Sequence, residues 1–119
     1  MKTQILQTFA ALVLITTSAT AQDNPMENHT ASYIAMPAAE GQTEAFAEFL
    51  AGAAPTVKET EPGTVLWFAL QADDTLAIFD IFADEEARNA HFSGAVAAAL
   101  SQNADALVAG GWDDGVVAN

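Results

Sequence analysis

The 119-residue chain contains no cysteine, only three lysines and arginines together, and only two histidines. The lack of cysteine excludes disulfide scaffolds, thiol nucleophiles, thiolate metal sites and iron–sulfur clusters. Two histidines are too few for a multi-histidine metal site within one chain. Sixteen aspartates and glutamates outweigh the few basic residues and give a formal net charge of −13. Such a surface repels phosphate groups, so we expect no nucleic-acid partner and no binding to anionic membranes.

Apolar residues are plentiful, at 51% of the chain. That share is typical of a globular protein, and the length allows one small domain. A short chain without disulfides depends on packing or on oligomerisation for its stability. The composition therefore favours a homodimer.

The first 21 residues have the layout of a secretory signal peptide. Lys2 provides a positive start, residues 9–15 form an unbroken apolar run, and Ala19-Thr20-Ala21 offers small residues for cleavage. The apolar run is too short to span a bilayer, so we expect no membrane segment after cleavage. We predict a signal peptide at 1–21, a polar arm at 22–28 and a folded domain at 29–119. The predicted location is periplasmic or secreted.

Alternating and turn-bounded apolar residues predict four strands in the folded domain. Three are expected at 29–37, 64–71 and 75–83, and a short last strand at Val116-Val117. The two central strands are joined around Asp73-Asp74. They therefore form a hairpin.

Helical periodicity predicts two helical regions between these strands. The first runs from Glu40 to about Glu59, with Thr43 as its cap. Pro55 should either kink this helix or begin a second short turn at 56–59. The second begins after Asp84 as its cap, bends at Ser93-Gly94 and continues in a further piece at 103–108. The resulting β-α-β-β-α-β order is that of the ferredoxin-like α+β fold, with a four-stranded antiparallel sheet.

The hairpin is apolar on both of its faces. Leu66, Phe68 and Leu70 share one face of its first strand, while Trp67 lies on the other. One layer of helices covers only one face of a sheet, so the second face must meet a ligand, another sheet or a second copy of the chain.

Several short motifs now occur in a recognisable order. They are Gly41, Glu61-Pro62-Gly63, Trp67-Phe68, Asp84-Glu85-Glu86 and Ala90-His91. In this order and spacing, residues 31–108 resemble the antibiotic biosynthesis monooxygenase family, which includes quinol monooxygenases. The resemblance implies a dimeric α/β barrel in which two four-stranded sheets face one another, and this would cover the second face of the hairpin.

The resemblance also implies oxygen chemistry on electron-rich phenols or hydroquinones without metal, flavin or another cofactor. Such chemistry needs a phenolate held in a dry, aromatic-lined pocket beside a base or a hydrogen-bond acceptor. Related barrels that degrade haem use an Asn–Trp–His set. His91 occupies the helix position where those proteins carry tryptophan, and no histidine follows on that helix, so haem cleavage is not expected.

Three residues are candidates for catalysis. His91 matches the histidine on the family's second helix, and its usual pKa suits a base near neutrality; the alternative is a histidine at the helix surface or in an interface. Tyr33, the sole tyrosine, is a candidate for orienting a substrate oxygen. Asp80 shares a strand face with apolar residues, so it either pairs with Arg88, acts as a base of raised pKa, or is exposed near the strand end.

Three aromatic residues are candidates for binding substrate: Trp67, Phe68 and Phe92. For Trp67, packing in the core or at an interface is the alternative. Together these residues predict an exported, cofactor-independent monooxygenase that oxidises a quinol or polyphenol with O₂. The alternative is a non-catalytic dimeric barrel that binds a small apolar ligand.

Overall fold

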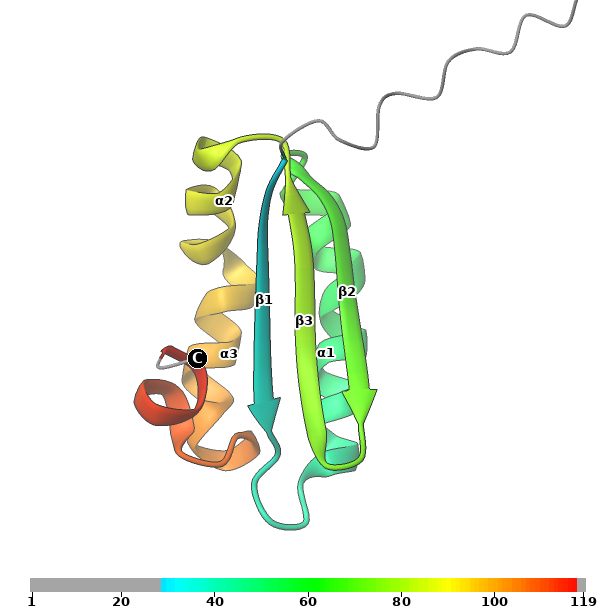
Figure 1. Ribbon diagram of the computed structural model, residues 1–119, viewed down its shortest axis with the longest axis vertical. Coiled ribbons are helices and arrows are strands. Elements are labelled where there is room, and N and C mark those ends of the chain that lie inside the picture. The colour runs from blue at the N-terminus through cyan, green and yellow to red at the C-terminus, as the bar shows by residue number, and fades with distance from the viewer. Residues whose placement is uncertain (1–28, 118–119) are drawn as a thin grey trace, which may run out of the picture.

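A three-stranded antiparallel sheet backed by helices forms the structure, a computed structural model that describes residues 29–117 (Figure 1). The strands are β1 (Thr30–Pro37), β2 (Thr64–Ala72) and β3 (Thr75–Phe82), in the order β1-β3-β2. β3 is therefore central, and β1 and β2 are the edges. The predicted signal peptide (1–21) and arm (22–28) lie outside the described residues.

In Figure 1 the helices lie behind and beside the strands. They are α1 (Thr43–Thr60), α2 (Glu85–Phe92) and α3 (Ala95–Leu107), followed by a π-helical turn, η1 (Asp113–Val117). The expected bend at Ser93-Gly94 separates α2 from α3. The piece predicted at 103–108 continues α3 rather than standing alone.

The predicted fourth strand is wrong for the described residues. After α3 the chain makes one antiparallel bridge to the edge of β1, between Val108 and Ala38. Gly110 and Gly111 follow at φ values of +86° and +65°, which few other residues adopt, and they turn the chain away from the edge. Val116 then packs into the core from η1 instead of pairing in the sheet.

Two details of α1 also differ from the sequence-based expectation. Gln42, not Thr43, is the N-cap residue, and the Thr43 hydroxyl donates instead to Oδ1 of Asp74 at 2.8 Å. Pro55 lies inside one continuous 18-residue helix. Its ring is on the exposed side, while Ala53 and Val57 on either side of it are buried, so packing of the apolar face holds the helix together.

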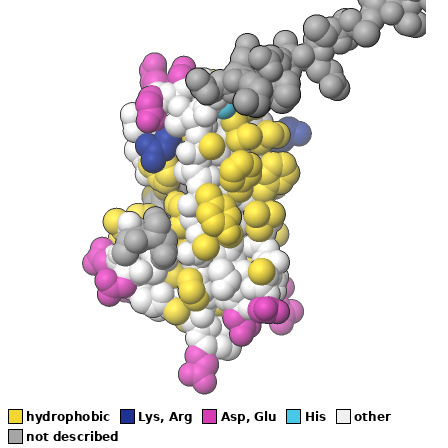
Figure 2. Space-filling view, viewed as in Figure 1, with side chains coloured by type: hydrophobic (Ala, Val, Ile, Leu, Met, Phe, Trp, Pro, Cys, Tyr) yellow, Lys and Arg dark blue, Asp and Glu magenta, His cyan; other side chains and the backbone are white. Residues whose placement is uncertain are grey.

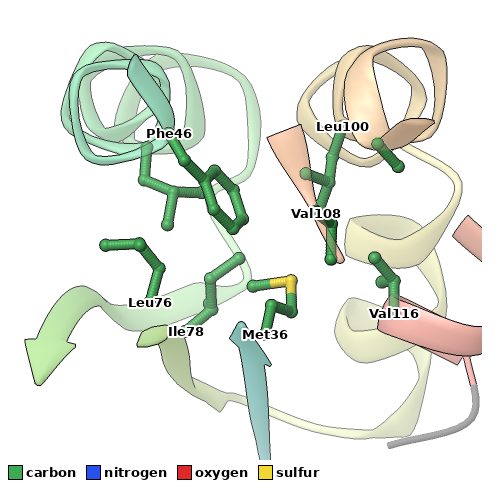
Figure 3. Close-up of a cluster of buried hydrophobic side chains, with 9 residues drawn as sticks. Met36, Phe46, Leu76, Ile78, Leu100, Val108 and Val116 are labelled. Atoms are coloured by element: carbon green, nitrogen blue, oxygen red, sulfur yellow. The ribbon is translucent and has the colours of Figure 1, made fainter. Parts of the chain in front are cut away.

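The main core lies between the sheet, α1 and α3, where the side chains of these elements point toward one another (Figure 3). Phe46 and Leu50 from α1 meet Leu76 and Ile78 from β3, and all four are at most 5% exposed. The remaining members are Met36, Leu100, Ala104, Val108 and Val116. This core fixes α1 and α3 on one face of the sheet.

The opposite face of the sheet is apolar, and no other element among residues 29–117 covers it, as the hairpin pattern predicted. Cross-strand register aligns Tyr33, Phe79 and Phe68 in one row across the three strands. Leu66 and Leu70 flank this row on β2 and are 45% and 47% exposed. Figure 2 shows the apolar side chains gathered over the strands. No helix among the described residues is long and apolar enough to cross a membrane.

Candidate functional site

A buried histidine lies between two carboxylates on the side of the sheet that the helices cover. Nδ1 of His91 is 2.5 Å from Oε2 of Glu61, and Nε2 is 3.2 Å from Oδ2 of Asp80. All three side chains are buried, with exposures of 6%, 8% and 1% in that order. We refer to Asp80, His91 and Glu61 as the buried triad. Charged groups are rarely buried in this way unless they are paired, and here each carboxylate is paired with the imidazole.

Three elements bring the triad together. His91 lies on the last turn of α2, which begins where Oδ1 of Asp84 accepts the backbone N–H of Ala87 at 2.8 Å. Asp80 comes from β3, and Glu61 follows directly after α1. Gly94 leaves room for Glu61, because a Cβ at that position would lie 2.8 Å from Oε1 of the carboxylate.

The two carboxylates control the charge of the imidazole. Burial by itself disfavours the imidazolium, but the hydrogen bonds and charges of Asp80 and Glu61 outweigh it and raise the pKa of His91 above its usual value of 6.5. The protonated ring then donates one N–H group to each carboxylate. Because both ring nitrogens are engaged, a substrate proton would reach His91 only through one of its partners.

Hydroxyl groups extend the triad on both sides. The Ser32 hydroxyl donates to Oδ2 of Asp80 at 3.2 Å, and the Thr64 hydroxyl donates to Oε2 of Glu61 at 3.2 Å. Oδ1 of Asp80, Oε1 of Glu61 and Nε1 of Trp67 are buried without a hydrogen-bond partner in the structure. Buried polar groups without a partner are uncommon in protein interiors.

A pocket of about 470 Å³ opens where β1 meets α2 and η1. We call it the β1-edge pocket. Aromatic side chains are prominent in its lining, and one basic side chain, Arg88, contributes a charge. Its wall also includes Ser32, which connects the pocket to Asp80. The lining consists of Ala31, Ser32, Tyr33, Ile34, Arg88, Phe92, Trp112, Val116 and Val117.

The predicted site residues divide into three places. Tyr33 and Phe92 meet at the β1-edge pocket. His91 and Asp80 lie in the buried triad, and Asp80 is neither exposed nor paired with Arg88, which instead lies 3.7 Å from Glu85. Their roles as catalytic or binding residues stay predictions.

The other two predicted aromatic residues, Trp67 and Phe68, lie away from the β1-edge pocket. They line a separate pocket of about 390 Å³ between α1 and β2. Trp67 also packs against the apolar core, which agrees with the packing alternative. Within the described chain, Phe68 contributes mainly to the uncovered sheet face, where it is 47% exposed.

Sequence reasoning missed the roles of Glu61, Ser32 and Trp112. Glu61 was interpreted only as part of a turn, although a carboxylate 30 positions from the histidine becomes its closest partner. The role of Ser32 could have been predicted, because it precedes Tyr33 on β1 and β1 pairs with β3, the strand of Asp80. Nothing in the pattern of the last residues indicated that Trp112 would line a pocket.

The triad shows no sign of being a metal site. Within residues 29–117, no group of three or more histidine and acidic side chains has an arrangement that could hold a metal ion. Each triad carboxylate has at least one oxygen committed to the imidazole and to a hydroxyl. The paired imidazole and carboxylates can take part in hydrogen bonding and proton transfer.

Comparison with solved structures defines the class of fold. A "putative antibiotic biosynthesis monooxygenase" from Bacteroides thetaiotaomicron has a TM-score of 0.60 at 18% identity, covering 68% of this chain and 80% of that one. PA3566 from Pseudomonas aeruginosa has a TM-score of 0.62 at 18% identity, covering 71% and 88%. The chain is thus a ferredoxin-like α+β protein of the kind seen in antibiotic biosynthesis monooxygenases. At this identity the likeness shows the fold alone.

A more similar protein places the chain in a family. NE2512 from Nitrosomonas europaea, a protein of unknown function, is 44% identical with a TM-score of 0.65, covering 68% of this chain and 79% of that one. The chain belongs to the same family as NE2512. No protein-family profile matches the chain, and no curated protein matches it either.

Proposed function

We propose that this protein is a cofactor-independent monooxygenase that oxidises a small quinol or polyphenol in the β1-edge pocket. The observation that carries the proposal is the Ser32–Asp80 hydrogen bond, which joins an aromatic-lined pocket to a buried ionisable triad. A monooxygenase of this type must remove a proton from a phenol inside an apolar cavity. The fold shared with a possible antibiotic biosynthesis monooxygenase supports this assignment.

The first chemical step uses residues of this chain only. The substrate hydroxyl transfers its proton to Oγ of Ser32 while the Ser32 proton passes to Oδ2 of Asp80. Ser32 is thereby restored, the carboxylate becomes neutral and the substrate becomes a phenolate. His91 holds Asp80 in place through Nε2, 3.2 Å away, and Glu61 holds the other side of the ring. Phe92 and Trp112 position the aromatic ring in the pocket, and Tyr33 orients a substrate oxygen.

Oxygen then reacts with the electron-rich phenolate. The phenolate passes an electron to O₂, and the two recombine so that a carbon–oxygen bond forms at the ring. One atom of O₂ stays in the product, a hydroxyquinone when a hydroquinone is the substrate, and the other leaves as water. The substrate supplies all four electrons that this reduction of oxygen needs, two as the ring C–H becomes C–OH and two as the hydroquinone becomes a quinone. The scheme therefore requires no further reductant.

We also propose that the protein is exported and acts as a homodimer. The signal-peptide layout of residues 1–21 supports export. The uncovered sheet face supports self-association, because its large apolar side chains, such as Phe68 and Leu70, are close to half exposed. A second copy presenting the same face would bury both, in the manner of two packed sheets. Fractionation of cells that express the full chain tests export: recovery in the cytoplasm at full length would contradict it.

The test of the proposed function is oxygen consumption by the purified protein with a panel of hydroquinones, anthrones and catechols at pH 6 to 9. We expect Ser32→Ala to lower the turnover rate by about 10²-fold, because the path to Asp80 is lost. Ser101→Ala, which removes an exposed hydroxyl on α3, is the matched control and should turn over normally.

Two outcomes would contradict the scheme in different ways. If Ser32→Ala turns over at the normal rate, with the fold intact by circular dichroism, the buried triad does not take up the substrate proton through Ser32. If folded protein consumes no oxygen with any substrate but retains an aromatic ligand, the non-catalytic binding barrel would replace the monooxygenase.

A further inference from the structure

The β1-edge pocket combines aromatic walls with a single charge. Of the described residues that line it, Arg88 alone carries a charge, and no carboxylate is among them. The guanidinium carbon of Arg88 lies 5.0 Å from the centre of the Phe92 ring, so the cation rests on one of the aromatic walls. A ligand ring that packs against these walls therefore lies close to the guanidinium.

Arg88 is free to accept a further anionic partner. Its only ion pair in the described chain is with Glu85, one turn earlier on α2, at 3.7 Å and with the carboxylate side chain 66% exposed. Exposed pairs of this spacing contribute little energy. The guanidinium presents several N–H donors in one plane, a geometry that matches the two oxygens of a carboxylate.

The positive charge of Arg88 contrasts with the acidic charge of the rest of the molecule. The chain has a net charge of −13, and a neighbouring pocket of about 430 Å³ is lined by Glu61, Asp84 and Glu86. The other described cation, Lys58, lines pockets beside α1 that also include a glutamate. An anionic small molecule is thus repelled over most of the surface and finds at the β1-edge pocket a cation whose one ion-pair partner in the described chain is an exposed glutamate.

We propose that the β1-edge pocket binds an aromatic carboxylate, with the ring between Phe92 and Trp112 and the carboxylate on Arg88. As a statement about the substrate class, this inference rests on the proposed function: the quinol or polyphenol would carry a carboxylate. As a statement about binding, it stands on the pocket alone. Arg88 is then the residue that determines specificity.

The test compares two ligands that differ only in the carboxylate, 6-hydroxy-2-naphthoate and 2-naphthol. Binding to the purified full chain is measured by isothermal titration calorimetry without oxygen, at low and at high salt. We expect the naphthoate to bind about tenfold or more tightly than the naphthol, because a charge-assisted pair adds to the shared ring contacts. The preference should shrink as salt is added.

Three variants assign the preference to Arg88. Arg88→Gln should bind both ligands equally, and Arg88→Lys should keep part of the preference because it retains the charge without the planar fork. Lys58→Gln, which removes the same charge away from the pocket, should behave as the wild type. If Arg88→Gln does not fold, Arg88→Lys alone decides: an unchanged preference for the naphthoate would overturn the role of the fork.

Equal affinity of the wild type for both ligands, or a preference that survives in Arg88→Gln, would overturn the inference. Oxygen uptake is then measured separately with 1,4-dihydroxy-2-naphthoate and 1,4-dihydroxynaphthalene. Binding preference without uptake would preserve the anion site and reject the monooxygenase. Oxygen uptake without a binding preference for the carboxylate would support the monooxygenase and reject the anion site. The two proposals therefore fail independently.

Discussion

At the scale of single residues, the environment of His91 is the most informative feature of the molecule. A lone histidine on a short helix would be unremarkable at the surface. Here its ring is held between Asp80 and Glu61, and it also packs against the ring of Phe82 at 5.3 Å between centroids. The charged groups that face it from the sheet and from the end of α1 are both acidic. The folded state therefore favours the imidazolium more than the unfolded state does.

This difference predicts a dependence of stability on pH. Since the pKa of His91 is raised in the folded protein, its stabilisation is fully present below pH 6.5 and is lost as the pH rises through the raised pKa. We expect the free energy of unfolding in urea to fall across this range more steeply for the wild type than for His91→Gln. His29→Gln removes the other, exposed histidine and should follow the wild type. Parallel curves for the wild type and His91→Gln would contradict the prediction.

At the scale of secondary structure, the start of α2 sets the position of the triad. Asp84 accepts the N–H of Ala87, so the helix begins at a defined residue and His91 falls on its inner side seven residues later. Asp84→Ala removes this acceptor and should lower the free energy of unfolding by about 1 kcal/mol. Asp84→Asn keeps a capping oxygen and should lose much less. Chemical denaturation of the two variants measures the difference, and equal losses would show that the side-chain charge, not the cap, matters.

Pro55 offers a second test within α1. A proline in a helix interior removes one backbone hydrogen bond and crowds the preceding turn. Because Pro55 is exposed and the helix continues past it, Pro55→Ala should raise the free energy of unfolding by about 1 to 2 kcal/mol, after the gain in unfolded-chain entropy is subtracted. A rise in the thermal midpoint measures this. No rise would mean that the helix already accommodates the proline without cost.

At the scale of the whole molecule, the uncovered sheet face exposes large apolar side chains whose burial against a partner would be favourable. The apolar row of Tyr33, Phe79 and Phe68 runs across all three strands, and the core helices α1 and α3 of the described chain pack against the opposite face. Our proposal that a second copy covers it predicts that Phe68→Glu shifts the protein from dimer to monomer in size-exclusion chromatography with light scattering. Two carboxylates would otherwise be buried in the shared interface.

A matched variant separates the interface from a general effect of added charge. Ala51→Glu places the same carboxylate on the exposed side of α1 and should leave the dimer intact. A monomeric wild type at all concentrations would contradict the proposal, and so would a dimer unaffected by Phe68→Glu.

Much of this protein could be predicted from its sequence, because the information is local. Alternating apolar residues identified the strands and their two faces, Asp84 marked the helix start, and the doubly apolar hairpin implied an uncovered face. These features depend on side-chain periodicity and on residues a few positions apart. The prediction of a fourth strand failed because two valines are too short a strand signal, and the glycines before them turn the chain away from the sheet edge.

Only the tertiary structure decided which distant residues share a site. Asp80, His91 and Glu61 come from a strand, a helix and a helix end, and the gap at Gly94 that admits the glutamate depends on how these elements pack. Likewise, Arg88 and Trp112 meet because α2 and the final turn converge on the edge of β1. No spacing along the chain encodes such contacts. They arise when the burial of apolar faces brings elements together. Polar groups buried between those faces then pair with one another, because an unpaired buried polar group is costly.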